Sequence, residues 1–244
     1  MDNILSVKRD YLAKILRRLI FKHVTSEICI QIQNWETTFS CIFRDVSTIT
    51  TIEPCEGLVA SVEEYRCSFR NGIILLDYVC SSPEPVINIL RDGAKIVFST
   101  TTSSFSLLDT DHPVLGYTAP VISFEDSVCF AFEGKDLIVF LERLKILRSI
   151  SDELHFSDDR CFSVNDFGTK FEVALPVVSG SFADNAFSCG LLIDFFEKIA
   201  GYEDPTFDVR VYIPDIMVIV YGGLRFYIGP LLDEPLQLTL NPHI

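Results

Sequence analysis

Two segments of the chain share one spacing of apolar and basic residues. Each follows the pattern Leu-x-x-(Ile/Phe)-Leu-x-Arg-Leu, and the copies begin at Leu12 and Leu137. Apolar residues at this spacing line one stripe of an α-helix. The sequence therefore predicts a helix over 7–23 and another over 134–149, each followed by segments with the alternation of β-strands.

Alternating apolar and polar residues dominate the segments after each predicted helix. This alternation, rich in Val, Ile, Thr, Phe and Tyr, is typical of strands with one solvated face. The expected strands cover 27–33, 37–43, 46–52, 58–69, 86–90 and 94–108, then 154–156, 161–165, 170–178, 207–213 and 217–228. The segment 73–79 is short enough to be helix or strand, and its counterpart, the amphipathic segment 188–200, favours helix.

The two halves of the chain resemble each other beyond the first helix. Phe69 and Gly72 lead into one apolar run, and Phe187 and Gly190 lead into another, each followed by a predicted hairpin. Each half therefore contains helix, strands, helix and hairpin in that order. We expect an α+β fold in which two similar domains each carry two helices packed on antiparallel sheets.

A segment with little periodicity separates the two halves. It contains two prolines and a glycine, residues that are typical of linkers. The sequence therefore predicts a first domain at 1–112, an interdomain connector at 113–124 and a second domain at 125–244.

Positive charge is concentrated in the two repeated helical segments. The chain has 20 Lys and Arg against 34 Asp and Glu, a formal net charge of −14. Half of the basic residues lie in these segments: Lys8, Arg9, Lys14, Arg17, Arg18, Lys22, Lys135, Arg143, Lys145 and Arg148. They are either the solvated faces of two ordinary amphipathic helices or a nucleic-acid surface on a protein that otherwise repels nucleic acid. Their repetition at matched positions favours the second interpretation.

Composition argues against membrane insertion and secretion. Hydrophobic residues make up 48% of the chain and the mean hydropathy is +0.31. No run approaches the ~18 uninterrupted apolar residues of a spanning helix, and charges interrupt the N-terminal segment where a signal peptide would have its apolar core. The eight cysteines are scattered without a C-x-x-C pair, which indicates reduced thiols. We expect an intracellular protein that is not secreted.

Motifs of enzymes are missing from the sequence. None of the four histidines lies in a metalloprotease motif, and no G-x-S-x-G, G-x-G-x-x-G or Walker-type loop occurs. Asp109, Asp111 and His112 are a conceivable metal site, but acidic residues beside a proline-containing segment are more often a solvated turn. We expect no enzymatic activity, no cofactor and no metal.

Two stretches of the chain resemble DNA sliding clamps, the ring-shaped processivity factors of replication. The C-terminal run Gly-Leu-Arg-Phe-Tyr-Ile-Gly-Pro-Leu-Leu-Asp-Glu, residues 223–234, is similar to the ending of PCNA. The stretch 69–108, with its Asn-Gly, its Asp-Gly hairpin and its exit toward a proline-containing linker, resembles the first domain of T-even phage clamps. In the order of elements the resemblance covers nearly the whole chain.

The resemblance implies a ring around double-stranded DNA. Two-domain clamps usually close as homotrimers, with the helices lining the hole and the sheets outside. The ten basic residues named above would then lie on or near the inner wall, where they contact phosphate without reading bases. Subunit contacts in the family pair an edge strand of each domain, for which the candidates are 96–107 and 170–178.

The resemblance also implies peptide-binding partners, namely a DNA polymerase, other clamp-binding proteins and a clamp loader where one is used. The matching pocket residues are Val114, Leu115, Tyr117, Pro230, Leu231 and Leu232. They are equally explained as loop residues packed on their own domain, and the tail 233–244 is long enough to cover part of the pocket. Two alternative functions remain: a clamp-like accessory protein in viral late transcription, and a β-rich viral structural subunit. A structural subunit would have no reason to concentrate cations on two repeated helices.

Overall fold

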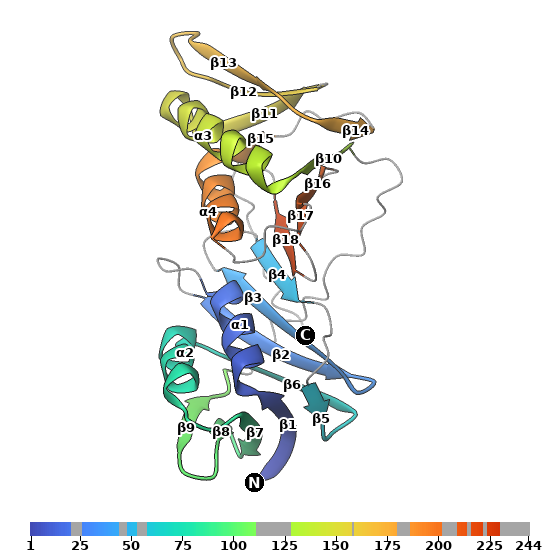
Figure 1. Ribbon diagram of the computed structural model, residues 1–244, viewed down its shortest axis with the longest axis vertical. Coiled ribbons are helices and arrows are strands. Elements are labelled where there is room, and N and C mark those ends of the chain that lie inside the picture. Colours follow the sequence, from blue (N-terminus) through green and yellow to red (C-terminus); the bar gives the residue numbers. More distant parts are fainter. Residues whose placement is uncertain are drawn as a thin grey trace, which may run out of the picture. The chain divides into compact units, whose positions relative to one another are not determined.

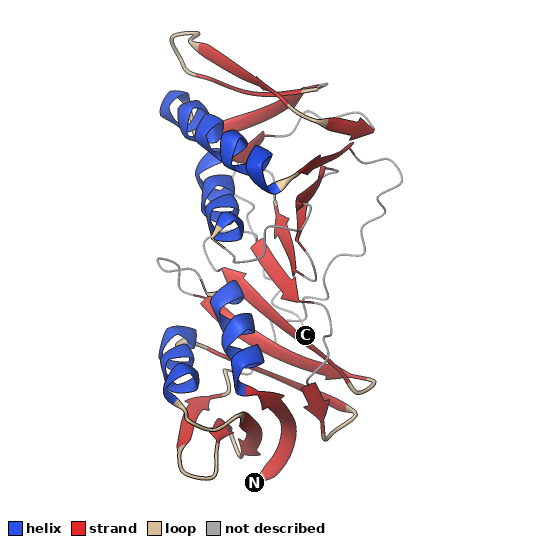
Figure 2. Ribbon diagram, in the orientation of Figure 1, coloured by secondary structure: helices blue, strands red, loops and turns tan. Residues whose placement is uncertain are grey.

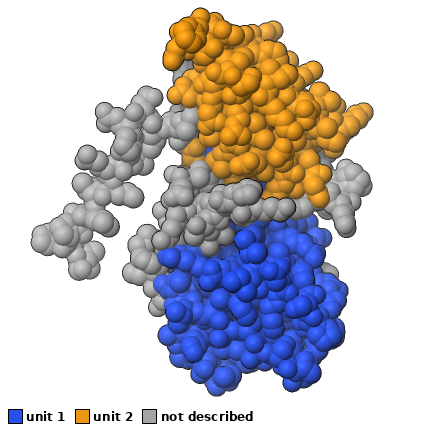
Figure 3. All heavy atoms as spheres, turned by 90° about the vertical axis from the view of Figure 1, so that its left-hand side faces the viewer, with its two compact units in different colours: residues 1–123, 218–228 blue, residues 124–217, 229–244 orange. Residues whose placement is uncertain are grey.

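The computed structural model divides the chain into two compact units (Figures 1 and 3). Unit 1 comprises residues 1–123 and 218–228, and unit 2 comprises 124–217 and 229–244. The structure describes residues 1–20, 26–43, 48–52, 58–110, 128–157, 159–179, 186–201, 209–213, 216–221 and 224–229. The domain boundaries given above, with a connector at 113–124, stay a prediction.

The described residues of unit 1 form two helices and two sheets. Its elements are β1 (Asp2–Lys8), α1 (Arg9–Leu19), β2 (Ser26–Gln33), β3 (Glu36–Phe43), β4 (Thr48–Ile52), β5 (Leu58–Ala60), β6 (Glu64–Phe69), α2 (Gly72–Ser81), β7 (Val86–Asp92), β8 (Lys95–Ser99), β9 (Ser104–Leu108), β18 (Leu224–Ile228) and most of β17 (Met217–Tyr221). One sheet has the order β5-β1-β7-β8-β9, and the other has the order β6-β2-β3-β4-β18-β17. Neighbouring strands are antiparallel where their register is defined, as in β2 with β3 and β8 with β9.

The helices of unit 1 lie beside each other and cover β2 and β3 (Figures 1 and 2). Helix α1 buries the apolar stripe that begins at Leu12, and α2 buries Leu75 and Val79. A Cβ atom on Gly72 would lie 2.6 Å from Cδ1 of Ile28, so the glycine lets the first turn of α2 approach β2. Burial of this stripe fixes which face of α1 is solvated.

Unit 2 repeats the combination of two helices with antiparallel strands. Its elements are β10 (Val128–Phe132), α3 (Gly134–Ile150), β11 (Glu153–Ser157), β12 (Arg160–Val164), β13 (Lys170–Ala174), β14 (Val177–Ser179), β15 (Ala186–Ser188), α4 (Cys189–Ala200) and β16 (Val209–Ile213). One group of strands has the order β14-β10-β16, and a four-stranded sheet has the order β13-β12-β11-β15. The predicted α+β class, with two helices on antiparallel strands in each unit, is confirmed.

Aromatic rings fill the core of unit 2. The rings of Phe132 and Phe140 stack with centroids 4.5 Å apart, and Phe196 of α4 meets both rings edge-on. Phe130 stacks against Phe156 of β11. Offset and edge-to-face contacts of this kind add stability beyond the area they bury. They fix α3 and α4 against β10, and thereby fix the solvated face of α3.

Several sequence-based boundaries are wrong. The expected strand over 58–69 is two strands, β5 and β6, in different sheets, and the expected strand over 170–178 is β13 and β14, also in different sheets. The first helix ends at Leu19 rather than residue 23. The first helix begins at Arg9 rather than residue 7, because residues 2–8 form the unpredicted strand β1 between β5 and β7. The expected strand over 94–108 is the hairpin of β8 and β9, which turns at Thr100–Ser103, where Thr100 N–H donates to the carbonyl of Ser103. As a result β9, and not β8, is the edge strand of its sheet.

Candidate nucleic-acid interface

Helix α1 presents its basic residues on the face opposite its buried stripe. Leu12, Ile15 and Leu16 are buried, so Lys14 and Arg17, three positions apart, lie together in solvent. Arg18 is partly exposed beside them. Arg17 also contacts α2, since its guanidinium donates to Sγ of Cys80 at 3.3 Å. This face of α1 is a compact positive surface.

Arg9, at the start of α1, has a structural role. Lys8 ends β1, and Arg9 is the first residue of the helix. The Arg9 guanidinium is 2.7 Å from the carboxylate of Asp10 and donates to the carbonyl of Ser82 at 2.8 Å. Arg9 therefore ties the N-terminus of α1 to the C-terminus of α2 and has fewer donors left for a ligand.

Helix α3 exposes all four of its predicted basic residues. Leu137, Phe140, Leu141, Leu144 and Leu147 are buried, which leaves Lys135, Arg143, Lys145 and Arg148 in solvent. Along the described part of the chain, Lys135 and Arg143 on α3, like Lys14 on α1, make no ion pair. They carry the charge most readily available to an anion.

Carboxylates engage the other two cations of α3. The Lys145 ammonium lies 3.0 Å from Glu142 and 3.2 Å from Glu197 of α4. Hydrogen bonds first to Glu142 and then to Glu197 raise the pKa of Lys145. Arg148 lies 3.8 Å from Asp152. The α3 surface is therefore less positive than its count of basic residues indicates.

The second helix of each unit carries little positive charge. Helix α2 has no Lys or Arg, and Ile73 and Ile74 are half exposed on it. Helix α4 exposes Asp194 and Glu197 and has one basic residue, Lys198. Among the described helices the positive surfaces are thus those of α1 and α3, the two copies of the repeated pattern.

Several predicted site residues lie outside the described residues. These are Lys22 of the basic set and the whole predicted peptide pocket, Val114, Leu115, Tyr117, Pro230, Leu231 and Leu232. Of the conceivable metal site only Asp109 is described, and its carboxylate accepts the backbone N–H of Ser68 at 3.1 Å. No group of three His, Cys, Asp or Glu side chains among the described residues is placed to hold a metal ion.

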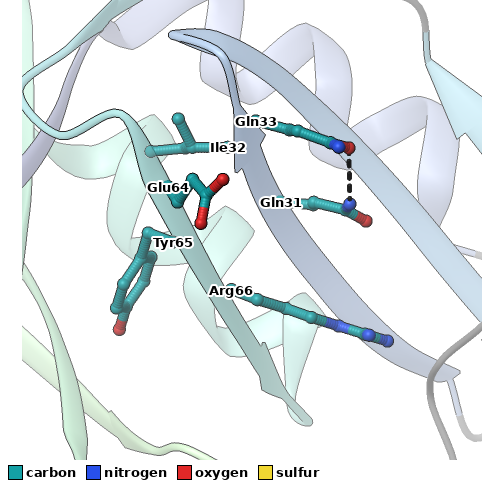
Figure 4. A pocket seen from close by; sticks show the side chains of 6 residues that line it. All are labelled: Gln31, Ile32, Gln33, Glu64, Tyr65 and Arg66. Carbon is teal, nitrogen blue, oxygen red and sulfur yellow. Dashed lines mark hydrogen bonds between the residues drawn. The ribbon is translucent and has the colours of Figure 1, made fainter.

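One polar groove of unit 1 was not predicted from the sequence (Figure 4). It has a volume of about 370 Å³ and is lined by Gln31, Ile32, Gln33, Glu64, Tyr65 and Arg66 of β2 and β6. The Gln31 amide donates to Gln33 at 3.4 Å, and the Tyr65 ring points away from these polar side chains. Burial raises the pKa of Tyr65, so its hydroxyl stays protonated near neutral pH.

Burial also makes the described core cysteines poor nucleophiles. Burial raises the pKa of Cys161 and of Cys189 to about 12, so both are thiols at neutral pH. All of the described cysteines are free. No helix among the described residues is both long and apolar enough to span a membrane.

The structure is similar to DNA sliding clamps of known structure. The β chain of DNA polymerase III from Streptococcus pneumoniae aligns with 96% of this chain at a TM-score of 0.72 and 15% identity, and the β subunit from Thermotoga maritima with 95% at 0.73 and 15%. In each case the chain spans 66% of the length of that protein. PCNA of A. fulgidus, solved with the C-terminal region of FEN-1, aligns over 96% of this chain and 100% of its own, at a TM-score of 0.64 and 15% identity.

These likenesses show a sliding-clamp fold, as expected from the sequence. No protein-family model matches the chain. No curated protein matches it either. At 15% identity the resemblance lies in the arrangement of elements, because few side chains are shared.

Proposed function

We propose that this chain is a DNA sliding clamp, a processivity factor that encircles duplex DNA and tethers replication proteins to it. One observation carries the proposal: in a chain with the sliding-clamp fold, exposed basic residues gather on the same helix in both units. Lys14 and Arg17 occupy α1, and Lys135 and Arg143 occupy α3. A protein with a net charge of −14 can approach DNA only through such a surface.

The chemistry of this surface suits sliding. Lys and Arg side chains contact phosphate oxygens, which repeat along every duplex and carry no sequence information. The binding free energy then comes mainly from counterion release, so affinity falls steeply with salt. Lys14, Lys135 and Arg143 are exposed and make no ion pair with described residues, which favours exchange between neighbouring phosphates.

The ring requires contacts between copies, and each unit offers an edge strand beside a helix. In unit 1 the edge is β9, where the ring of Phe105 stacks on Tyr78 of α2 at 5.5 Å. In unit 2 the edge is β13, and α3 beside it exposes Val139 and Ile146. Pairing β9 of one copy with β13 of the next is heterologous, and a heterologous contact forms a ring when the rotation between copies closes. By resemblance to the two-domain clamps, the proposed ring is a homotrimer.

Clamp-binding peptides complete the proposal. The fold neighbour from A. fulgidus was solved with the C-terminal region of FEN-1, so one protein of this fold binds a peptide segment. By resemblance, the corresponding pocket here comprises Val114, Leu115, Tyr117 and residues 230–232. A DNA polymerase is the expected partner.

Charge reversal tests the DNA contact. Lys14→Glu with Arg143→Glu should weaken binding to duplex DNA of any sequence and lower the slope of log K against log salt by roughly 0.9 for each lost phosphate contact. Arg66→Glu with Arg91→Glu, which reverses two exposed cations on β6 and β7, is the matched control and should bind DNA like the unmodified chain. Both variants should keep the wild-type oligomeric state in sedimentation. Equal DNA affinity for the helix variant and the control would refute the proposed DNA contact.

A further inference from the structure

The hairpin of β2 and β3 turns on two residues with left-handed backbone. Gln33 pairs with Glu36 across the turn, and Asn34 and Trp35 between them have φ values of +52° and +67°. A two-residue turn with positive φ at both positions favours Asn followed by Gly, because Gly takes this conformation without steric cost. The chain instead has its only tryptophan at the second position, where a bulky side chain is strained.

Burial of the indole ring does not offset this strain. The side chain of Trp35 is 57% exposed, so a large part of its apolar surface stays in water. The turn is nevertheless tied to the next strand, since the backbone N–H of Trp35 donates to the carbonyl of Glu63 at 3.3 Å. Strained residues of this kind cluster at functional sites, where the side chain that they present is needed.

The polar groove of unit 1 adjoins this turn. Gln33 is opposite Glu36 of β3 and also opposite Glu64 of β6, so the groove residues Gln33 and Glu64 lie at the turn end of the sheet. The groove volume of about 370 Å³ is that of a small ligand site and admits a short stretch of extended chain. Gln31 and Gln33 lie side by side along it, joined by a long hydrogen bond of 3.4 Å (Figure 4). Their amides can therefore bind the main chain of a peptide.

The charges at the turn favour a cationic occupant. Glu36, Glu63 and Glu64 are exposed, and none of them forms an ion pair with another described residue. An indole ring beside such carboxylates attracts a Lys or Arg side chain through cation–π and ion-pair interactions. The same carboxylates repel the phosphates of a nucleic acid. Arg66, two residues after Glu64 on β6, gives the far end of the groove the opposite charge.

We propose that unit 1 binds an extended, basic segment of another protein in this groove, with a Lys or Arg side chain of that segment against the ring of Trp35. The main chain of the segment lies over Gln31 and Gln33. An Asp or Glu two residues from the cation would lie on the same face of the segment and meet Arg66. The inference goes beyond the proposed clamp function and does not rest on it, because every residue involved belongs to unit 1.

The fluorescence of Trp35 tests the occupant, since the chain has no other tryptophan. A peptide of alternating lysine and serine should change the emission of Trp35 saturably, and a peptide of alternating glutamate and serine should not. Neither probe has the hydrophobic anchors of clamp-binding peptides. Single-stranded oligo(dT) tests base stacking on the same ring and should leave the emission unchanged. An emission change with oligo(dT) and none with the lysine peptide would overturn the proposal.

Two substitutions separate this site from the general attraction of an acidic protein for basic peptides. Trp35→Gly keeps the net charge and should weaken binding of the labelled lysine peptide by about fivefold or more in fluorescence anisotropy. Glu64→Gln should weaken it by about two- to threefold. Asp166→Asn, the matched control, removes the same charge at an exposed position of unit 2 and should have little effect. Equal affinities of all three variants would overturn the proposal.

Stability distinguishes this binding role of Trp35 from a structural one. Glycine relieves the strain of a positive φ, so Trp35→Gly should have a Tm at least as high as that of the unmodified chain. Loss of peptide binding without loss of Tm is therefore the expected result. A lower Tm with unchanged peptide binding would show that the indole ring serves the fold, and would overturn the proposal.

Discussion

Glu197 of α4 holds the ammonium group of Lys145 of α3 at 3.2 Å. This ion pair spans the two helices of unit 2, and Glu142 contacts the same ammonium from within α3. In the proposed clamp both carboxylates would face phosphate beside a cation. Their charge repels DNA and competes with phosphate for Lys145.

Removing these carboxylates should therefore strengthen DNA binding. We expect Glu142→Gln with Glu197→Gln to bind duplex DNA several-fold more tightly and to show a salt slope steeper by about one unit, because Lys145 becomes free to release a counterion. Fluorescence anisotropy over a salt series measures both quantities.

Glu36→Gln is the control for this charge change, because Glu36 is an exposed acid on β3. It should leave DNA affinity nearly unchanged. If the double Gln variant binds no more tightly than this control, α3 does not face phosphate through Lys145.

The hydrogen bonds that Glu84 accepts should stabilise the fold to an extent that depends on pH. Its carboxylate accepts hydrogen bonds from the hydroxyl and N–H groups of Thr101 and Thr102, which lower its pKa from 4.5 to about 2. Because the pKa is lower in the folded state, the bonds add stability above pH 4.5, and this gain is lost as the pH falls toward 2. The Tm of Glu84→Ala should lie below that of the unmodified chain at pH 6, and the two should converge near pH 2.

A variant that keeps the Glu84 carboxylate is the control for the loss of the side chain in Glu84→Ala. Thr101→Val removes one hydroxyl donor and should show a smaller Tm difference with the same pH dependence. A Tm difference for Glu84→Ala that stays constant from pH 6 to pH 2 would mean that these hydrogen bonds do not depend on the charge of Glu84.

A buried carboxylate joins three parts of unit 1. Glu27 of β2 is 4% exposed and accepts hydrogen bonds from the hydroxyls of Ser68 and Thr110, and Arg70 lies 3.7 Å away. Glu27→Ala should lower the free energy of unfolding by about 1–3 kcal/mol, because the hydroxyls of Ser68 and Thr110 can then satisfy only each other, which leaves one donor unpaired in a buried site. Urea unfolding measures the loss. Glu63→Ala, at an exposed position, should cost under about 0.5 kcal/mol, and an equal loss in both would contradict this role.

The helices were predictable from the sequence, whereas β1 was not. The burial of Leu12 and Leu137 follows from the helical spacing of the apolar residues around them, which is a local property of the sequence. In β1 the register with β7 shifts between Asn3 and Leu5, so the adjacent Ile4 and Leu5 are both buried and the alternation disappears.

The basic face of the candidate site could also be predicted, but its effective charge could not. The repeated pattern placed Lys14 and Arg143 on solvated faces, as the structure shows. The contact of Lys145 with Glu197 joins residues of two different helices, so no local pattern indicates it. The prediction that these cations bind DNA concerns a partner and stays a prediction.

A side chain at residue 72 should destabilise the start of α2 unless Ile28 is shortened. A Cβ atom would lie 2.6 Å from Cδ1 of Ile28 and 3.2 Å from Ile20, so Gly72→Ala should destabilise the fold by about 1–3 kcal/mol through overpacking. Ile28→Val removes Cδ1 and should by itself cost about 1 kcal/mol. In the double variant the clash with Ile28 is relieved, so its loss in urea unfolding should be smaller than the sum of the single losses. Strictly additive losses would show that the contact with Ile20, rather than the contact with Ile28, opposes a side chain at residue 72.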